Sequence, residues 1–168
     1  MPVTQFNLND GQRAERKLLI TVAEWTEGST QVREILGRRT EDSSIDYNAD
    51  IETTTDILGI NYTDLNRTQP QQDFDPYLIL GGSKLGAKLN DIRRRNAISE
   101  LNDFTVYIIT AFAGASGAYE AEKHTGCTIV YNSIGGDSNV NMPISVYFSN
   151  NITTGTVDKL SDDFEFTA

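Results

Sequence analysis

The chain has few of the residues on which several common protein classes depend. Its 168 residues include one cysteine, one histidine and one tryptophan. One cysteine excludes an internal disulfide framework and favours synthesis in a cytoplasm. No apolar run approaches the length of a membrane span, and the first residues, MPVTQFNLNDGQRAERK, lack the basic-then-apolar order of a secretory signal. We therefore expect a single soluble domain over residues 1–168, with no insertion into a membrane.

Basic residues are also scarce, and those present are unevenly placed. The chain has 14 Lys and Arg against 24 Asp and Glu, a formal net charge of −10. Every charged residue from Glu41 to Asp64 is acidic. Cations gather instead in what we call the basic cluster: Lys84, Lys88, Arg93, Arg94 and Arg95. This balance argues against binding nucleic acid through phosphate neutralisation, since like charges repel, whereas an acidic surface by itself aids solubility.

Catalytic and metal-binding patterns are lacking too. His124 and Cys127 lie close together in KHTGC, but a structural zinc site normally takes four ligands, and a catalytic pair needs a third group to orient the imidazole. Cys127 is expected to be a small buried hydrophobe. GGSK at 81–84 lacks the glycine spacing of a phosphate-binding loop, and Leu85 follows its lysine where Ser or Thr is needed. We expect no enzyme activity, no cofactor and no metal, with a hydrolase that uses an unrecognised carboxylate pair as an alternative.

The stretch EDSSIDYNADIETTTDILG contains a run of evenly spaced polar residues. Asp46, Asn48 and Asp50 are two residues apart, as in the first half of an EF-hand loop. Ile51 and Ile57 then stand where that loop needs a glycine and a bidentate glutamate, which argues against calcium. The period of two predicts a strand instead, with one apolar and one polar face. The polar face carries Ser44, Asp46, Asn48, Asp50 and Glu52.

Most of the chain has the composition of β-structure. Segments rich in Val, Ile, Thr, Tyr and Phe alternate with runs of Gly, Asn, Asp and Ser, which is typical of strands and turns. We expect strands over 17–25, 30–36, 43–53, 104–112, 118–131 and 139–148. Strands so closely spaced predict a mainly β fold, a sandwich or a barrel.

One segment, residues 81–96, has helical periodicity. Leu85, Leu89 and Ile92 fall on one helix face, and Ser83 is placed to cap the first turn. The stripe stops there, so the helix is expected to end near residue 96. The arginines of the basic cluster fall at its C-terminal end, where cations suit the helix dipole. The basic cluster has two interpretations, this electrostatic role or an interface with another subunit.

The segment from 53 to 76 follows neither periodicity and is long for a connection inside a compact domain. Its apolar residues, which a solvated linker would not need, are Ile57, Leu58, Ile60, Tyr62, Leu65 and Phe74. A loop with such anchors is expected to dock onto another molecule. We expect the polar N-terminal segment (about 1–16) and the C-terminal tail (about 156–168) to contribute in the same way.

The order of segments resembles that of a known family. The collinear stretches EDSSIDYNADIETTTDILGINYTDLN, FDPYLILGGSKLGAKLNDIRRRNA and AEKHTGCTIVYNSIGGDSNVNMPISVYFSNN resemble major tail tube proteins of tailed bacteriophages, of the long-tailed, siphovirus-like kind. The resemblance implies a β-sandwich with one flanking α-helix. It also implies hexameric rings, in which the inner sheet of each subunit contributes to a shared β-barrel, stacked into a tube.

The resemblance further implies a non-catalytic structural protein of the virion tail, assembled in the cytoplasm of the bacterial host. Its partners would be further copies of itself, with tape-measure, tail-tip and tail-terminator proteins, and double-stranded DNA would pass through without specific binding. The polar face from Ser44 to Glu52 would line the channel, where an acidic wall repels DNA across a layer of water and cations. The alternative is that this face lies outside and confers solubility.

Other functions stay open from the residues alone, because fold and composition do not fix function. A contractile tail, a bacteriocin or a secretion-like particle would use a related tube. A β-sandwich that binds carbohydrate is a further alternative. Such a site usually presents exposed aromatic residues, whereas Trp25 lies inside a strand-like run.

Overall fold

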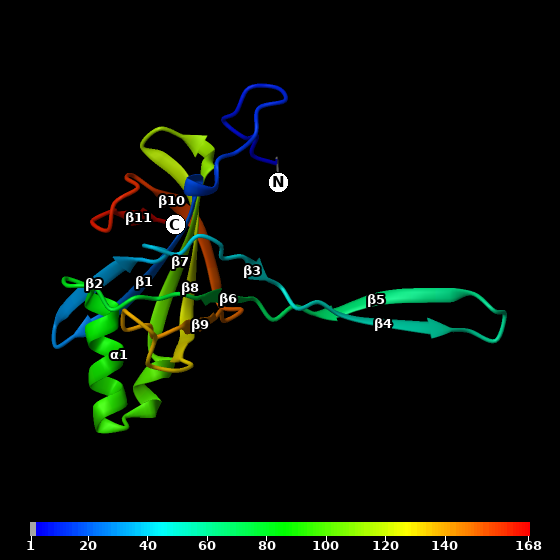
Figure 1. Ribbon diagram of the computed structural model, residues 1–168. Helices are drawn as coiled ribbons and strands as arrows, with labels where there is room; N and C mark the ends of the chain where they lie inside the picture. The colour runs from blue at the N-terminus through cyan, green and yellow to red at the C-terminus, as the bar shows by residue number, and fades with distance from the viewer. Residues whose placement is uncertain (1–2) are drawn as a thin grey trace.

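The computed structural model describes residues 3–168, and most of its regular structure is β-strand (Figure 1). The strands are β1 (Leu19–Glu27), β2 (Thr30–Ile35), β3 (Ile45–Asp46), β4 (Asp50–Thr55), β5 (Asn61–Arg67), β6 (Gln71–Phe74), β7 (Phe104–Ala115), β8 (Ala118–Tyr131), β9 (Ile144–Tyr147), β10 (Ile152–Val157) and β11 (Phe166–Thr167). The helices are α1 (Lys84–Arg95) and the short 3₁₀ turns η1 (Arg16–Leu18) and η2 (Ile98–Asn102). The expected class, mainly β with one flanking α-helix, is confirmed for the described residues.

A large antiparallel sheet forms the body, in the order β2-β1-β7-β8-β9-β6-β3. The long strand β8 has two partners on one edge: residues 119–124 pair with β10, and residues 128–131 pair with β9. The change of partner falls around Gly126, whose φ of +78° is a conformation that glycine adopts without a steric penalty. The sheet therefore divides at β8 into two arms, one ending in β10 and β11 and the other in β9, β6 and β3.

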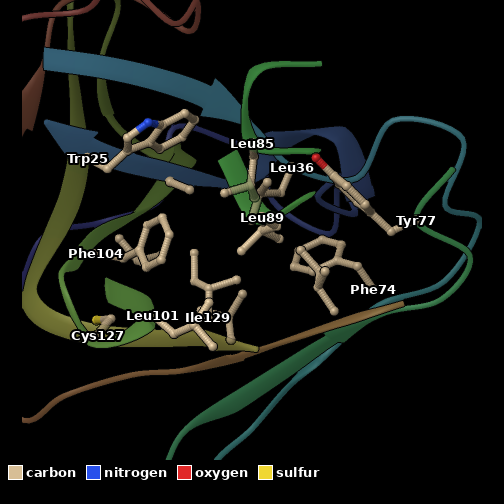
Figure 2. Close-up of a cluster of buried hydrophobic side chains, with 14 of the residues drawn as sticks. Trp25, Leu36, Phe74, Tyr77, Leu85, Leu89, Leu101, Phe104, Cys127 and Ile129 are labelled. Carbon is tan, nitrogen blue, oxygen red and sulfur yellow. The ribbon is translucent and has the colours of Figure 1, made fainter. Parts of the chain in front are cut away.

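The main core lies between this sheet and α1 (Figure 2). Leu85, Leu89 and Ile92 of α1 are fully buried, as the helical spacing predicts. Trp25 and Phe104 meet edge to face, with ring centroids 6.1 Å apart. No helix within residues 3–168 is both long and apolar enough to cross a membrane.

The ends of α1 match the sequence prediction. The Ser83 hydroxyl accepts a hydrogen bond from the Gly86 N–H at 3.2 Å, so Ser83 is the N-cap. At the other end Asn96 has a φ of 54°, the left-handed conformation that stops a helix. The expected helix over 81–96 is confirmed as Lys84–Arg95.

A smaller apolar cluster covers the opposite face of the sheet. Because side chains alternate along a strand, β7 sends Val106 to the main core and Tyr107 to this second cluster. Val157 and Phe164, both 1% exposed, complete the cluster from the C-terminal region. The tail (156–168) thus packs on its own sheet through these two residues, and the expectation that its exposed part contacts another subunit stays a prediction.

Residues 50–67 leave the body as a long two-stranded hairpin, β4 paired with β5 (Figure 1). Every residue of both strands is exposed. The expected loop over 53–76 is thus wrong in form: it comprises most of this hairpin, followed by β6. Neither face of the hairpin is buried in its own chain, so the apolar period that predicts a strand over 43–53 reaches only the first residues of β4 and does not mark the rest of the hairpin.

The N-terminal segment runs along the outside of the body. Residues 3–15 are almost all exposed, and Phe6 packs edge to face on Phe112 at 5.4 Å between ring centroids. The Asn7 amide donates to the carbonyl oxygen of Ala111 at 3.1 Å. Residues 1–2 of the predicted segment (1–16) lie outside the described residues.

Candidate assembly interface

The tip of the hairpin is an ordered turn built around Asp56. Its carboxylate oxygen Oδ1 accepts hydrogen bonds from the backbone N–H groups of Leu58 (2.8 Å) and Ile60 (3.0 Å), and Oδ2 accepts one from the Tyr62 hydroxyl (3.2 Å). The Ile60 N–H, and then the Leu58 N–H and the Tyr62 hydroxyl, lower the pKa of Asp56. Gly59, with a φ of +78°, completes the turn. In the sequence, Asp56 stands three residues before Gly59, a spacing typical of a turn, and this spacing is the local signal for the tip.

Apolar side chains point outward from this turn and from the strands behind it. Ile57 is 102% exposed and Leu58 is 78% exposed. The larger set, which we call the hairpin apolar residues, is Ile51, Ile57, Leu58, Ile60, Tyr62 and Leu65. Single exposed apolar residues are ordinary, but a concentration of them on one projecting element marks an interaction site. All of these except Ile51 are predicted anchors, and they are exposed in the isolated chain.

Phe74 is a correction to the predicted set of anchors. It lies in β6 and is 1% exposed, packed in the main core (Figure 2). Its strand pairs with β9 through Phe74 and Ile144, which places it inside the body rather than on the hairpin. Phe74 therefore stabilises the fold and does not contact a second subunit.

The two faces of the hairpin differ in chemistry. Ile51 lies opposite Leu65 on one face, and Glu52 lies opposite Asp64 on the other. Directly opposed like charges destabilise a strand pair, so the acidic face is not optimised for the isolated hairpin. The Asn66 amide donates to Glu52 at 3.5 Å, and Asp50 pairs with Arg67 at 3.6 Å near the base. The base half of the hairpin thus has one apolar pair and one acidic pair on opposite faces, whereas the strands nearer the tip carry mostly threonine.

The polar face predicted from Ser44 to Glu52 is divided by the structure. Asn48 has a φ of 45°, and its N–H donates to the Asp46 carboxylate at 3.0 Å, so the chain turns here and the alternation ends. The prediction of one strand over 43–53 is wrong for this reason: β3 and β4 flank the turn. Ser44, Asp46 and Asn48 line a shallow polar depression of about 510 Å³, whereas Asp50 and Glu52 lie on the hairpin.

Part of the basic cluster is engaged within the chain. Its ion pairs are Lys84–Asp162 (3.3 Å), Lys88–Glu100 (3.3 Å), Arg95–Asp91 (2.7 Å) and Arg95–Glu100 (3.0 Å). Hydrogen bonds from Arg95 lower the pKa of both partner carboxyls. The Arg93 guanidinium contacts only the amide oxygen of Asn90, at 2.9 Å. Among the residues that the structure describes, Arg93 and Arg94 form no ion pair and stay available to a partner.

His124 and Cys127 are part of the packed interior. The His124 ring, 2% exposed, lies 3.0 Å from the carbonyl oxygen of Ser149 and 3.1 Å from the carboxylate of Glu122. Cys127 is fully buried, as expected, and burial raises the pKa of its thiol. The described part of the chain brings no three His, Cys, Asp or Glu residues together in a way that could hold a metal ion.

No protein-family model matches the chain, and no curated protein matches it. Solved structures contain chains that resemble it in part. A chain of the anti-feeding prophage baseplate is 8% identical, with 88% of this chain and 97% of that chain covered and a TM-score of 0.49. A chain of the sheath–tube complex of PVC, an extracellular contractile injection system, in its extended state is 10% identical (88% and 94% covered, TM-score 0.48). A chain of the tube-terminating cap of the anti-feeding prophage is 14% identical (93% and 99% covered, TM-score 0.48). Likeness at this level adds no argument about function.

Proposed function

We propose that this chain is a non-catalytic structural subunit that assembles with copies of itself into a phage-type tail tube. The observation behind this proposal is the projecting hairpin, whose ordered tip presents Ile57 and Leu58 to solvent. Full burial of an exposed Leu or Ile stabilises an assembly by about 1.5–3 kcal/mol. The sequence resemblance to tail tube proteins, which extends beyond the hairpin to residues 74–97 and 121–151, supports the same proposal.

The form of the hairpin favours an open assembly. It projects from one side of the body, and we propose that a different surface on a second copy receives it. Such a contact is heterologous, and heterologous contacts produce closed rings or open filaments rather than isolated dimers. A stack of rings is both closed, within each ring, and open, along the stack. We propose hexameric rings, with the hairpins joining one ring to the next.

The sheet also has edges that a ring would cover. β2 lies at one end of the strand order and β3 at the other. Unpaired edges are templates for pairing with another chain, and closing a sheet into a barrel removes them. We propose that the sheets of neighbouring subunits join in this way around a central channel.

The channel would pass DNA without binding it. The net charge of −10 and the polar depression that includes Asp46 suit a wall that repels phosphate over the screening length of about 8 Å. That Ser44, Asp46 and Asn48 face the channel stays a prediction. Asp50 and Glu52, predicted with them, lie on the projecting hairpin, so we propose that they meet a neighbouring subunit instead. In a tail, proteins at the tip, at the terminator end and inside the tube would be the remaining partners, whether the tail is contractile or not.

Negative-stain electron microscopy and analytical ultracentrifugation of the purified chain test the proposal. The natural chain should form rings or hollow tubes above a critical concentration. Ile57→Ser with Leu58→Ser should abolish the tubes and leave at most single rings, with thermal unfolding of the subunit unchanged, because both side chains lie outside the core. Ile98→Ser, at an exposed isoleucine of η2, is the matched control and should assemble normally.

Two results would count against the proposal. A natural chain that stays monomeric at every concentration would overturn self-assembly. Normal tubes from the doubly substituted hairpin would show that its tip has no part in the contact.

A further inference from the structure

Outside the hairpin, exposed apolar side chains gather beside α1. A groove of about 400 Å³ runs between this helix and two extended segments, and its lining includes Ile79, Ala87, Asn90, Ile134 and Val140. Ile79, Ile134 and Val140 are 41%, 46% and 51% exposed. The groove is concave and largely apolar, whereas the hairpin tip is convex and apolar, so the two could fit together.

The walls of the groove are held by backbone hydrogen bonds. The Ile79 N–H donates to the carbonyl oxygen of Val140 at 3.0 Å. Gly135 and Asn141 exchange N–H and carbonyl groups at 3.0 and 2.6 Å. A groove fixed in this way can receive a ligand without first ordering its own walls, which reduces the entropic cost of binding.

The charges around the groove complement those of the hairpin. Arg93 and Arg94 follow Asn90 by three and four residues, so they continue the same side of α1. They lie about 10 Å along the helix from Ala87, at 1.5 Å per residue. On the hairpin, Glu52 and its cross-strand neighbour Asp64 lie about 15 Å behind the tip, at 3.3 Å per residue. The hairpin thus has an apolar tip followed by two carboxylates, and the groove is followed by two arginines that form no ion pair among the described residues, so the two elements are complementary in the order of their chemistry.

The hairpin of the same chain does not supply this tip. α1 and the hairpin lie on different sides of the body, and the hairpin points away from the helix (Figure 1). We propose that the groove beside α1 is the docking site for the hairpin tip of a second copy, with Arg93 and Arg94 pairing with its acidic face. This inference rests on the proposed self-assembly and specifies the surface that receives the hairpin.

Disulfide trapping between two different variants tests the docking site. The natural chain has one cysteine, Cys127, which is fully buried, so an introduced thiol is the accessible one. Chains with Leu58→Cys are mixed with chains with Val140→Cys and oxidised mildly. We expect a covalent heterodimer between them, and about tenfold less when the second chain carries Ile98→Cys, an exposed position away from the groove.

A charge exchange gives a second, independent readout. Arg93→Glu with Arg94→Glu in the Val140→Cys chain should reduce trapping by about tenfold. Glu52→Lys with Asp64→Lys in the Leu58→Cys chain should restore it. Both pairs of side chains are exposed, so neither exchange disturbs the core.

The outcomes separate this inference from the proposed function. Tubes that form normally while Leu58→Cys and Val140→Cys give no more heterodimer than the Ile98→Cys control would overturn the docking site and leave self-assembly standing. Absence of both tubes and trapped heterodimers would overturn both. Trapping above the control that is restored by the charge exchange supports the groove.

Discussion

Arg33 holds the C-terminal region onto the sheet. Its guanidinium Nε lies 2.6 Å from the Glu24 carboxylate, which also accepts a hydrogen bond from the Tyr107 hydroxyl at 3.2 Å. The guanidinium packs over the Phe164 ring at 4.2 Å, and it donates to the carbonyl oxygen of Phe164. Burial, and then the charge of Glu24, raise the pKa of Tyr107 to about 12. One side chain thus joins the ion pair, the second cluster and the tail.

Replacing Arg33 by leucine should destabilise the subunit. The side chains of Arg33 and Glu24 are only 19% and 6% exposed, so the substitution leaves a nearly buried carboxylate without its partner. We expect the free energy of unfolding, measured with urea, to fall by about 3 kcal/mol. Adding Glu24→Leu should recover most of this loss, because the unpaired charge is then removed as well. An unchanged urea midpoint for Arg33→Leu alone would contradict the prediction.

At the scale of elements, the sequence was sufficient where an apolar period had a partner in the same chain. Leu85, Leu89 and Ile92 mark α1 because that face is buried, and Ser83 marks its start. The strand expected over 118–131 is β8, whose apolar residues alternate along the sheet. Local pattern and tertiary packing agree in these elements, which is why a pattern was enough.

Elements without such a period were missed. Both faces of the hairpin are exposed, so beyond residue 53 nothing in its pattern distinguishes it from a loop. In β6 the residue buried beside Phe74 is a glutamine: Gln72 accepts a hydrogen bond from Thr21 at 2.7 Å and donates one to Ser43 at 3.1 Å. A buried amide satisfied by residues far away in the sequence has no local signal. The groove beside α1 likewise depends on segments brought together only by folding.

The turn at the hairpin tip should depend on pH through Asp56. Its pKa is lower in the folded turn than the ordinary value of about 3.9, so the ionised carboxylate stabilises the turn fully above that value. The stabilisation is lost as the pH falls through the lowered pKa. We expect the protection factors of the Leu58 and Ile60 amide protons, measured by NMR hydrogen exchange and corrected for the intrinsic rate at each pH, to fall below roughly pH 4.

A substitution gives the same information at neutral pH. Asp56→Ala removes the acceptors for Leu58, Ile60 and Tyr62, so the tip should lose order and the critical concentration for assembly should rise. Thermal unfolding of the body should not change, because the hairpin contacts no part of the core. Asp56→Asn, which keeps one carbonyl oxygen as an acceptor, should be intermediate. Assembly of Asp56→Ala at the natural critical concentration would show that the turn need not be preformed.

On the scale of the whole molecule, the tip and the groove form two halves of one junction. Each chain has one of each, on different sides of the body, so every added subunit supplies the half that the next subunit needs. Growth then requires both halves in every copy. This is the condition for a heterologous assembly that does not stop at a pair.

Two variants that each lack a different half of the junction should therefore form one junction with each other, and no further growth should follow. Ile57→Ser with Leu58→Ser removes the tip and keeps the groove, whereas Ala87→Trp fills the groove at an exposed helix position and keeps the tip. Neither variant alone has a complete junction between rings, so each should sediment at most as single rings, with the natural thermal stability of the subunit. In an equimolar mixture of the two kinds of ring, the tips of the Ala87→Trp chains can enter the grooves of the other chains. The resulting pair of rings exposes only defective tips and filled grooves, so sedimentation should show paired rings and nothing larger. Tubes from the mixture, or single rings that never pair, would show that the tip and the groove are not two halves of the same contact.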